Sequence, residues 1–472
     1  MIPASSKSVR KVLIITQRFY PDPTVAAVRM TQWAKWLPEH GWKPIVACRN
    51  FGASLSRTEV ARAIHPDVDI VYLNDPPTSV APTTGVTSGG LVSAAIRVIA
   101  PDLIGTRPRS PVLRWCKEAV TSLRARRGQA KDAAFWRNAE DRIVDLVRCH
   151  RPDAVITTSP SVAVHSAGLR LMKEFPDLCW LADFRDDYRQ GGRYRVSLAK
   201  RYGSFKKFQH EGAIYRAASW ITCALPVHQR WIRRRFPECA NKMTIVLNGA
   251  PEELCAAARQ VGAHDRGGTV KVIGFSEARE SVALAQAVAA LRGAGEKIDL
   301  RFVGRVPTLR PAIEEALGDN VVFTGPVPHD RALGEAVSAR VLVAVLSENR
   351  SRLFLISSKL FEHLAVPVPV IVINPTRPDA SLFSRLGGVW MLKAPTAADI
   401  RTTLETALHT PFDQLQSRAL MVQESWNRRS QVQKLAVVLD NLYKGRGRNT
   451  NGEALAAPSL SSLSISAPPS AQ

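Results

Sequence analysis

The chain has 472 residues, of which 45% are hydrophobic, enough for two domains with cores of their own. Its 64 Lys and Arg residues outnumber 41 Asp and Glu residues, giving a formal net charge of +23. This charge suits an anionic partner, which could be nucleic acid, an acidic membrane surface or a phosphorylated substrate, or else it reflects an arginine-rich proteome. Seven scattered cysteines without metal-ligand spacing argue against a disulfide framework and structural zinc, and indicate a reducing compartment.

The first ten residues are too polar and too short for a signal peptide. No apolar run reaches the roughly 18–20 residues that span a bilayer. We therefore expect a protein that is soluble or attached to a membrane only at its surface.

The N-terminal region begins as an alternation of strands and helices. Residues 11–16 form a short apolar run, typical of a strand that is buried on both faces. A helix is expected from about Ala27 to His40, ended by Gly41 and followed by a strand at 44–47. This order of strand, helix and strand predicts a doubly wound parallel sheet.

Residues 76–131 interrupt this pattern. The segment is first rich in Pro, Gly, Ser and Thr and then basic, with nine Lys or Arg and two acidic residues from Arg97 to Lys131. Apolar residues repeat at helical spacing between Leu91 and Ile99. Two interpretations stay open: amphipathic helices that lie on an anionic bilayer, or an insertion that packs its apolar face on the domain and leaves its arginines in water.

A dense cluster of charges follows an apolar strand near the middle of the chain. A helix is expected at 132–150, then strands at 154–157 and 180–182 with a helix between them. The second strand runs directly into Asp183-Phe-Arg-Asp-Asp187. Because open α/β sheets bind ligands at the carboxyl ends of their strands, this loop is a candidate site.

The second half repeats the alternation after a glycine-containing linker at 256–268. Three of its expected strands are followed directly by Gly274, Gly304 and Gly325. A single long helix is expected from Phe412 to Tyr443. The six expected strands cover residues 270–273, 300–303, 321–324, 341–346, 369–373 and 389–392.

These patterns divide the chain into four parts. The first is an N-terminal Rossmann-like domain, 1–262, with the basic insertion at about 76–131. The second is a C-terminal Rossmann-like domain, 263–411. A helix at 412–443 would pack back across both domains, and residues 444–472 have the composition of a disordered tail.

Two Rossmann-like domains closed by a long C-terminal helix are the layout of GT-B glycosyltransferases. Five weak motifs in the right order resemble glycosyltransferase family 4, and the resemblance covers roughly residues 11–75 and 132–443. These motifs are Val12–Pro21 with Arg29, Trp36–Pro44, Pro152–Pro160 with Trp180–Asp186, Val246–Gly249, and Ser358–Leu364. The resemblance implies an α/β GT-B fold of two doubly wound domains that face a central cleft.

The same resemblance implies a metal-independent glycosyltransferase without a cofactor. It would move a sugar from a nucleotide-diphosphate donor to a glycan or lipid-linked acceptor in bacterial surface polysaccharide assembly. The protein would be cytoplasmic, and its basic 97–131 region could hold it on the anionic inner membrane. A nucleic-acid partner is not expected, because no segment resembles a base-reading or stacking motif.

The resemblance places the donor nucleotide on the second domain. Gly274 would let the backbone approach the diphosphate, and Arg279 would take charge on the leaving group. Ser358 would cap the donor-site helix, Lys359 would add charge, and Glu362 would accept the ribose hydroxyls. The plainer alternatives are a strand-end turn at Gly274 and a solvated charge favoured by the helix dipole at Glu362.

The chain departs from the family pattern at two places. Phe354 stands where many members have a glutamate that touches the donor sugar, and 24–27 lacks the paired glycines found near the donor phosphate. Arg29 could compensate by binding a donor or acceptor phosphate, or it is a surface arginine. These departures favour a rival function, a non-catalytic scaffold that binds a sugar nucleotide.

The loop at 183–186 stands where the family has its acceptor-side catalytic region. Asp186 would handle the proton of the acceptor hydroxyl or position that hydroxyl. Arg185 would pair with Asp186 or offset charge in the transition state. The alternative is an Arg–Asp ion pair that stiffens the loop, and His165, at a helix start, is interpreted as a structural residue.

Overall fold

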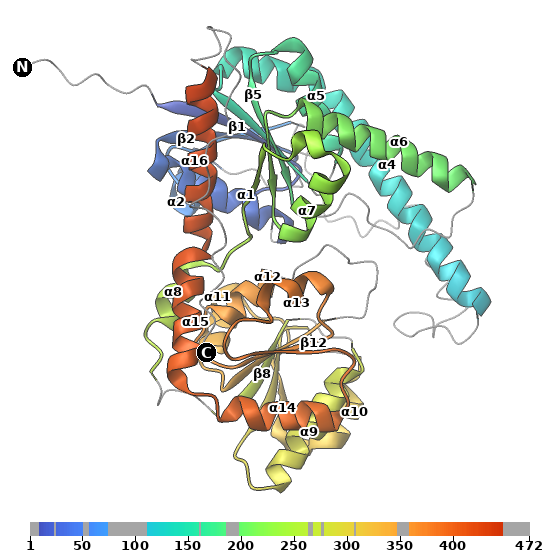
Figure 1. Cartoon of the computed structure of the whole chain (residues 1–472), viewed down its shortest axis with the longest axis vertical. Helices are drawn as coiled ribbons and strands as arrows, with labels where there is room; N and C mark the ends of the chain where they lie inside the picture. Colours follow the sequence, from blue (N-terminus) through green and yellow to red (C-terminus); the bar gives the residue numbers. More distant parts are fainter. Residues whose placement is uncertain are drawn as a thin grey trace, which may run out of the picture.

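The computed structural model describes residues 9–22, 25–50, 56–73, 111–159, 162–185, 198–262, 268–274, 278–305, 308–346 and 358–446. Two parallel sheets stand one above the other, each flanked by helices (Figure 1). The expected α/β class is confirmed.

The first sheet has seven strands in the order β3-β2-β1-β4-β5-β6-β7. All neighbours are parallel, and the order reverses between β1 and β4, which makes the sheet doubly wound. Its strands β4 and β5 are buried along their whole length, as expected where helices cover both faces. The strands are β1 (Arg10–Thr16), β2 (Trp42–Cys48), β3 (Asp69–Tyr72), β4 (Ala154–Thr158), β5 (Cys179–Phe184), β6 (Trp220–Cys223) and β7 (Met243–Ile245).

The helices of the first lobe include one that is much longer than expected. The helix expected at 132–150 begins at Pro111, inside the expected insertion, and its N-terminal half extends away from the sheet (Figure 1). Its C-terminal half packs Trp136, Ile143 and Val147 on the sheet. The rest of the insertion, 76–110, lies outside the described residues. The helices are α1 (Val25–Trp36), η1 (Leu37–His40), α2 (Arg57–Ala63), α4 (Pro111–His150), α5 (Ala163–Glu174), α6 (Leu198–Ala217), α7 (Pro226–Arg235) and η3 (Pro237–Cys239).

The second sheet has six parallel strands in the order β10-β9-β8-β11-β12-β13, so it reverses between β8 and β11. All six expected strands are present, within one or two residues of their expected ends. The strands are β8 (Thr269–Ile273), β9 (Asp299–Val303), β10 (Val321–Phe323), β11 (Val341–Val345), β12 (Val370–Ile373) and β13 (Val389–Leu392). The helices are α9 (Glu280–Gly293), α10 (Arg310–Leu317), η4 (Gly318–Asn320), α11 (His329–Val337), α12 (Ser358–Leu364), α13 (Arg377–Phe383) and α14 (Ala397–Leu408), and α8 (Glu252–Ala258) precedes them.

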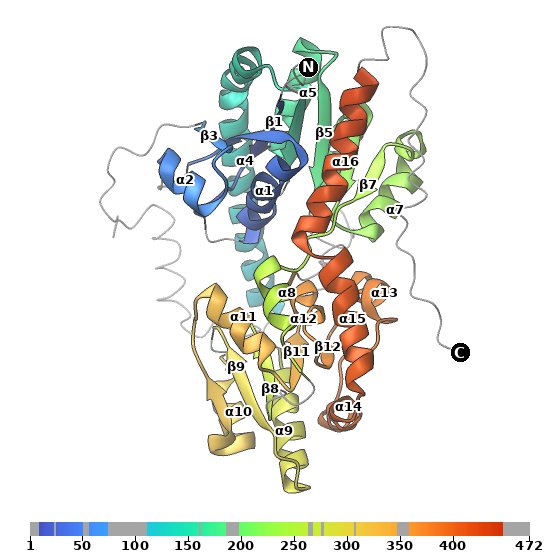
Figure 2. The same ribbon diagram turned by 90° about the vertical axis from the view of Figure 1, so that its left-hand side faces the viewer.

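The C-terminal segment consists of two helices, and the expectation of a single helix is wrong. The first, α15 (Phe412–Ser425), packs on the second lobe, and the second, α16 (Arg428–Arg446), packs on the first (Figure 2). Between them, the Asn427 side chain accepts a hydrogen bond from the Ser430 backbone N–H at 2.6 Å, which caps α16. The cap ends one helix and starts the next, so the chain can change direction while it returns to the first lobe.

Two segments cross between the lobes side by side, and we call residues 249–250 and 426–428 the crossing. The Ala250 N–H donates to the Trp426 carbonyl, and the Arg428 N–H donates to the Ala250 carbonyl, both at 2.9 Å. Gly249 has a φ of +70°, and a Cβ there would lie 2.9 Å from the backbone of the other segment. Glycine is therefore required where the two backbones meet.

The lobes also share an apolar cluster. Ala224 and Leu225, directly after β6, belong to the same buried cluster as Leu360 and Phe361 of α12. The residues after β6 in the first lobe and α12 of the second lobe therefore belong to one apolar cluster, and α12 lies on the side of the second lobe that faces the first (Figure 1). Among the helices described, none is long and apolar enough to cross a membrane.

Candidate functional site

Three glycines lie at the carboxyl edge of the second sheet. Gly274, Gly304 and Gly325 follow the neighbouring strands β8, β9 and β10, and their φ angles are +106°, +114° and +70°. The Gly274 N–H donates to the Val303 carbonyl at 2.8 Å, and the Gly304 N–H donates to the Gly325 carbonyl at 3.1 Å. L side chains rarely adopt such φ angles, so this edge is built of bare backbone that a ligand can approach closely.

The Lys359 side chain extends from α12 to this glycine edge. A Cβ atom built on Gly274 would overlap the Lys359 ammonium, so the ammonium lies in the space that the glycine leaves. Burial lowers the pKa of Lys359, and the nearby Glu362 carboxylate opposes that shift. A partly desolvated cation thus lies beside the loop after β8, at the point where the strand order reverses and open sheets bind ligands.

Glu362 lies one turn further along α12 and is held by an arginine from the crossing. Arg428 donates from its guanidinium to Glu362 Oε1 at 3.4 Å. The two side chains are 10% and 17% exposed, respectively. The interpretation of Glu362 as a solvated surface charge is therefore wrong, because the carboxylate belongs to a largely buried ion pair.

The C-terminal end of α12 is fixed by α15. The guanidinium of Arg418 is buried and donates to the backbone carbonyls of Leu364 at 3.3 Å, Val366 at 2.5 Å and Val368 at 2.8 Å. Gln423 donates to the Ala365 carbonyl at 2.7 Å. Leu364 ends α12, and Ala365, Val366 and Val368 lie in the turn between α12 and β12. These donors satisfy carbonyls that have no partner inside the helix, and they fix the end of α12 and the turn to α15.

The other two residues assigned to the donor have less support from the structure. Ser358 is the first residue of α12, as expected, and is covalently next to Lys359. Arg279 directly precedes α9 with an exposed side chain, and residues 275–277 between it and Gly274 lie outside the described part. The structure brings Gly274, Lys359 and Glu362 together, and the role of Arg279 stays a prediction.

Arg29 forms a buried ion pair in the first lobe, so the alternative of a surface arginine is wrong. Its guanidinium donates to both oxygens of Asp183, at 2.9 and 3.1 Å, and to the Leu247 carbonyl at 3.1 Å. Asp183 also accepts hydrogen bonds from the hydroxyls of Thr158 and Thr222. Arg29 is only 6% exposed, so a phosphate could bind it only if this network opened.

The predicted catalytic loop begins at the end of β5. The Arg185 N–H donates to the Ser159 hydroxyl at 3.0 Å, which joins this loop to the end of β4. Asp186 lies outside the described residues, and its catalytic role stays a prediction. His165 stacks on Phe184 with 4.5 Å between ring centroids and is fully buried, and burial lowers its pKa to about 3. A neutral histidine in the core fits the structural role given to it.

Arg418 and Arg428 were not among the site residues that the sequence predicted. Both act on α12 from the C-terminal helices, at separations of 50 or more residues. One local signal was available, because Asn427 is a good N-cap residue and marks the start of a helix with Arg428 as its first residue. No local pattern gives the partner of either arginine.

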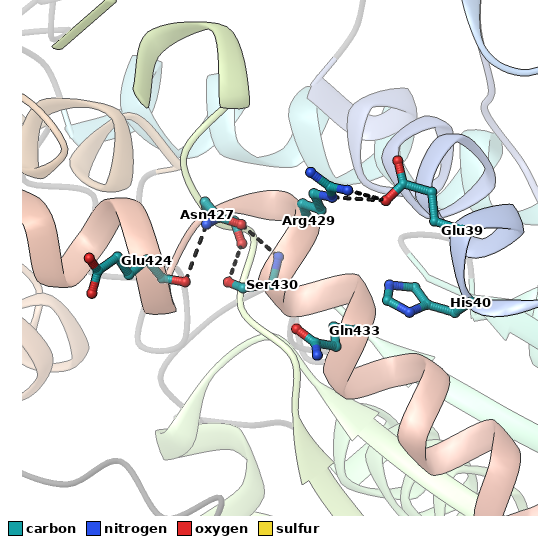
Figure 3. Close-up of a pocket in the computed structure, with 7 residues that line it drawn as sticks. All are labelled: Glu39, His40, Glu424, Asn427, Arg429, Ser430 and Gln433. Atoms are coloured by element: carbon teal, nitrogen blue, oxygen red, sulfur yellow. Dashed lines mark hydrogen bonds and ion pairs between the residues drawn. The ribbon is translucent and has the colours of Figure 1, made fainter. Parts of the chain in front are cut away.

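A polar surface pocket of about 560 Å³ lies on another part of the crossing (Figure 3). It contains none of the predicted site residues, and its polar groups largely bond to one another, as in the 2.7 Å ion pair between Arg429 and Glu39. We therefore place the candidate site at the glycine edge. The pocket is lined by Glu39, His40, Glu424, Asn427, Arg429, Ser430 and Gln433. No group of three or more His, Cys, Asp or Glu residues in the described ranges is placed to hold a metal ion.

Comparison with solved structures gives matches along nearly the whole chain. A glycosyltransferase from Rickettsia africae superposes with a TM-score of 0.56 at 11% identity, covering 93% of this chain and 99% of its own. Sucrose-phosphate synthase from Thermosynechococcus elongatus has a TM-score of 0.56 at 13% identity, covering 92% and 100%.

A third match is UDP-GlcNAc 2-epimerase from Neisseria meningitidis, bound to UDP-GlcNAc. Its TM-score is 0.54 at 11% identity, and the match covers 91% of this chain and 99% of the epimerase. No family model and no curated protein sequence matches. The chain thus has the GT-B fold, and at such low identity the similarity shows the fold alone.

Proposed function

We propose that the protein is a glycosyltransferase that uses a nucleotide-diphosphate-sugar donor. The observation that carries the proposal is the Lys359 ammonium at Gly274, with the Glu362 carboxylate near it, one helical turn further along α12. A cation beside bare backbone suits a diphosphate, and a carboxylate suits a pair of ribose hydroxyls. The Neisseria epimerase of the same fold is bound to UDP-GlcNAc, which supports a sugar nucleotide as the ligand.

In this proposal, the second lobe supplies the chemistry of the leaving group. As the bond between the sugar and the diphosphate breaks, negative charge grows on the leaving oxygen. The Lys359 ammonium would stabilise that charge, and its low exposure to water strengthens the interaction. Arg279 and Ser358 would add donors from the starts of α9 and α12. The reaction would need no metal ion.

The first lobe would bind the acceptor, a glycan or a lipid-linked sugar. Asp186 would take or position the acceptor proton, and Arg185 would offset charge in the transition state. By its resemblance to family 4, the enzyme would act in surface polysaccharide assembly in the cytoplasm. Its basic 97–131 region would bring it to an anionic inner-membrane surface.

Thermal shifts with a panel of UDP-, GDP- and other sugar nucleotides test the proposal. A ligand present at 100 times its Kd stabilises the native state by about 2.7 kcal/mol, which raises the melting temperature measurably. We expect one nucleotide class to shift the wild type and fail to shift Lys359→Ala. The control is Lys393→Ala, which removes an exposed lysine of the same lobe. If no sugar nucleotide shifts the wild type, the proposal is wrong.

A turnover assay separates an enzyme from a scaffold. Release of the nucleotide diphosphate from the donor found in the panel is followed with wild type, Asp186→Ala and Glu362→Ala. We expect Asp186→Ala to lose turnover while it still binds donor, and Glu362→Ala to lose both. Donor binding by the wild type without transfer or hydrolysis would favour the non-catalytic scaffold.

A further inference from the structure

Arg428 is the only residue of the crossing whose side chain reaches the candidate nucleotide site, among the residues that the structure describes. Its backbone N–H is held by the Ala250 carbonyl at 2.9 Å, so its Cα is fixed to the other crossing segment. From there the guanidinium extends to Glu362, 66 residues earlier in the chain. The contact therefore links the connection between the lobes to α12.

Arg428 has several acidic neighbours, but two of them have other partners. Burial lowers the pKa of Arg428, and the carboxylates of Glu362, Glu253 and Glu252 oppose that shift. Glu253 pairs with Lys35 of α1 at 3.3 Å, and Glu252 accepts the Arg429 backbone N–H at 3.0 Å. Glu362 is the carboxylate to which Arg428 donates a hydrogen bond.

The hydrogen bond involves one oxygen of Glu362. In the described part of the chain, Arg428 is the single hydrogen-bond donor to this carboxylate, and it contacts Oε1. A carboxylate that accepts hydrogen bonds from two neighbouring hydroxyls must present its plane in one orientation. A buried arginine with a fixed backbone restricts that plane, whereas a free glutamate side chain rotates.

We propose that Arg428 is a positioning residue that orients the Glu362 carboxylate for the ribose hydroxyls of a nucleotide. The inference rests on the proposed function, because it takes a nucleotide as the ligand of Glu362. It adds that ribose recognition depends on a residue of the crossing, outside the second sheet and its own helices. A change at the crossing should therefore alter the preference for ribose over deoxyribose in the nucleotide, without changing the diphosphate contacts.

Calorimetric titration with UDP, GDP and their 2′-deoxy forms tests the inference. We expect the wild type to bind the ribonucleotide about tenfold more tightly than the deoxynucleotide, since one hydrogen bond to a charged group is lost. Arg428→Gln should reduce that ratio to below about threefold by weakening the ribonucleotide alone. Arg428→Lys, which keeps the charge, should restore part of the ratio.

Arg429→Gln is the matched control. Arg429 is the next residue, and its guanidinium pairs with Glu39 at 2.7 Å, so this variant breaks a contact between α16 and the first lobe that does not involve Glu362. It should keep the wild-type ratio. If Arg428→Gln fails to fold, Arg428→Lys alone decides, because its ratio must fall between that of the wild type and that of Glu362→Gln.

Two results would overturn the inference while leaving the proposed function intact. One is an affinity ratio between ribonucleotide and deoxynucleotide that stays at its wild-type value in both Arg428→Gln and Arg428→Lys. The other is an equal loss of affinity for both nucleotides, which would show a purely structural role. A wild type that binds no nucleotide would overturn the proposed function together with this inference.

Discussion

The ammonium of Lys359 occupies the space that a side chain at Gly274 would fill. Gly274 directly follows β8 in the second sheet, and Lys359 is the second residue of α12, 85 residues further along the chain. This relationship brings the glycine edge and the helix into one site, and it can be tested from either residue.

Gly274→Ala should weaken nucleotide binding more than tenfold, because the new methyl group would displace the Lys359 ammonium. The change also places a side chain at a φ of +106°, which costs roughly 1–3 kcal/mol of stability. Gly295→Ala separates the two effects, because Gly295 has a φ of +98° and no atom within 4 Å of a Cβ. Both variants should lose similar stability in urea unfolding, and Gly274→Ala alone should lose affinity. Equal nucleotide affinities of the two variants would show that nucleotide binding does not depend on the space beside Gly274.

Nucleotide binding should weaken at alkaline pH, earlier than for an ordinary lysine. Burial holds the pKa of Lys359 below its usual 10.5, so the ammonium loses its proton as pH rises through that lowered value. Above it, the dissociation constant for a nucleoside diphosphate should rise about tenfold per pH unit. Calorimetric titrations between pH 7 and 10 measure this. Lys359→Arg, which keeps its charge, should remove this pH dependence of the dissociation constant. If the variant shows the same pH dependence as the wild type, Lys359 is not the group that titrates.

The protein should lose stability in mild acid because of two buried histidines. Burial lowers the pKa values of His165 and His363 to about 3, against an ordinary 6.5. Between these values the unfolded chain takes up a proton that the native histidine does not. Each histidine then removes about 1.4 kcal/mol of unfolding free energy per unit of pH, and neither does so above 6.5.

Urea unfolding at pH 7 and pH 5 measures the effect. His363→Leu should reduce the loss between the two pH values by about 2 kcal/mol, because one of the titrating groups is gone. Both ring nitrogens of His363 are buried without a hydrogen-bond partner among the described atoms, so leucine leaves no donor unsatisfied. An unchanged loss in His363→Leu would show that this histidine is protonated in the native state.

Arg418→Met should cost about 3–5 kcal/mol of unfolding free energy, because buried carbonyls in the turn after α12 lose their donor. Arg401→Met is the comparison, since Arg401 forms an exposed pair with Glu405 on one helix, a pair worth less than about 1 kcal/mol. Urea unfolding of both variants gives the two values. Equal small losses would show that water replaces Arg418 without cost.

The sequence by itself determined the elements that repeat locally. Short apolar runs gave all six strands of the second sheet, and glycine directly after a strand marked the edge where Gly274 lies. The start of α12 at Ser358 was also correct, because capping residues and apolar periodicity act within one or two helical turns. The break between α15 and α16 at Asn427 has a local signal too. It was not predicted, because the apolar periodicity continues across it and indicated a single helix.

Only the tertiary structure decided the partners of the charged residues. Arg29 was expected to bind phosphate or lie at the surface, and it pairs with Asp183, 154 residues away. Glu362 was placed correctly on its helix, but its partner Arg428 comes from the crossing. An isolated charge carries no local signal of its partner, because Coulomb energy depends on distance in space and on burial. Both are fixed only when the two sheets and the returning helix have packed.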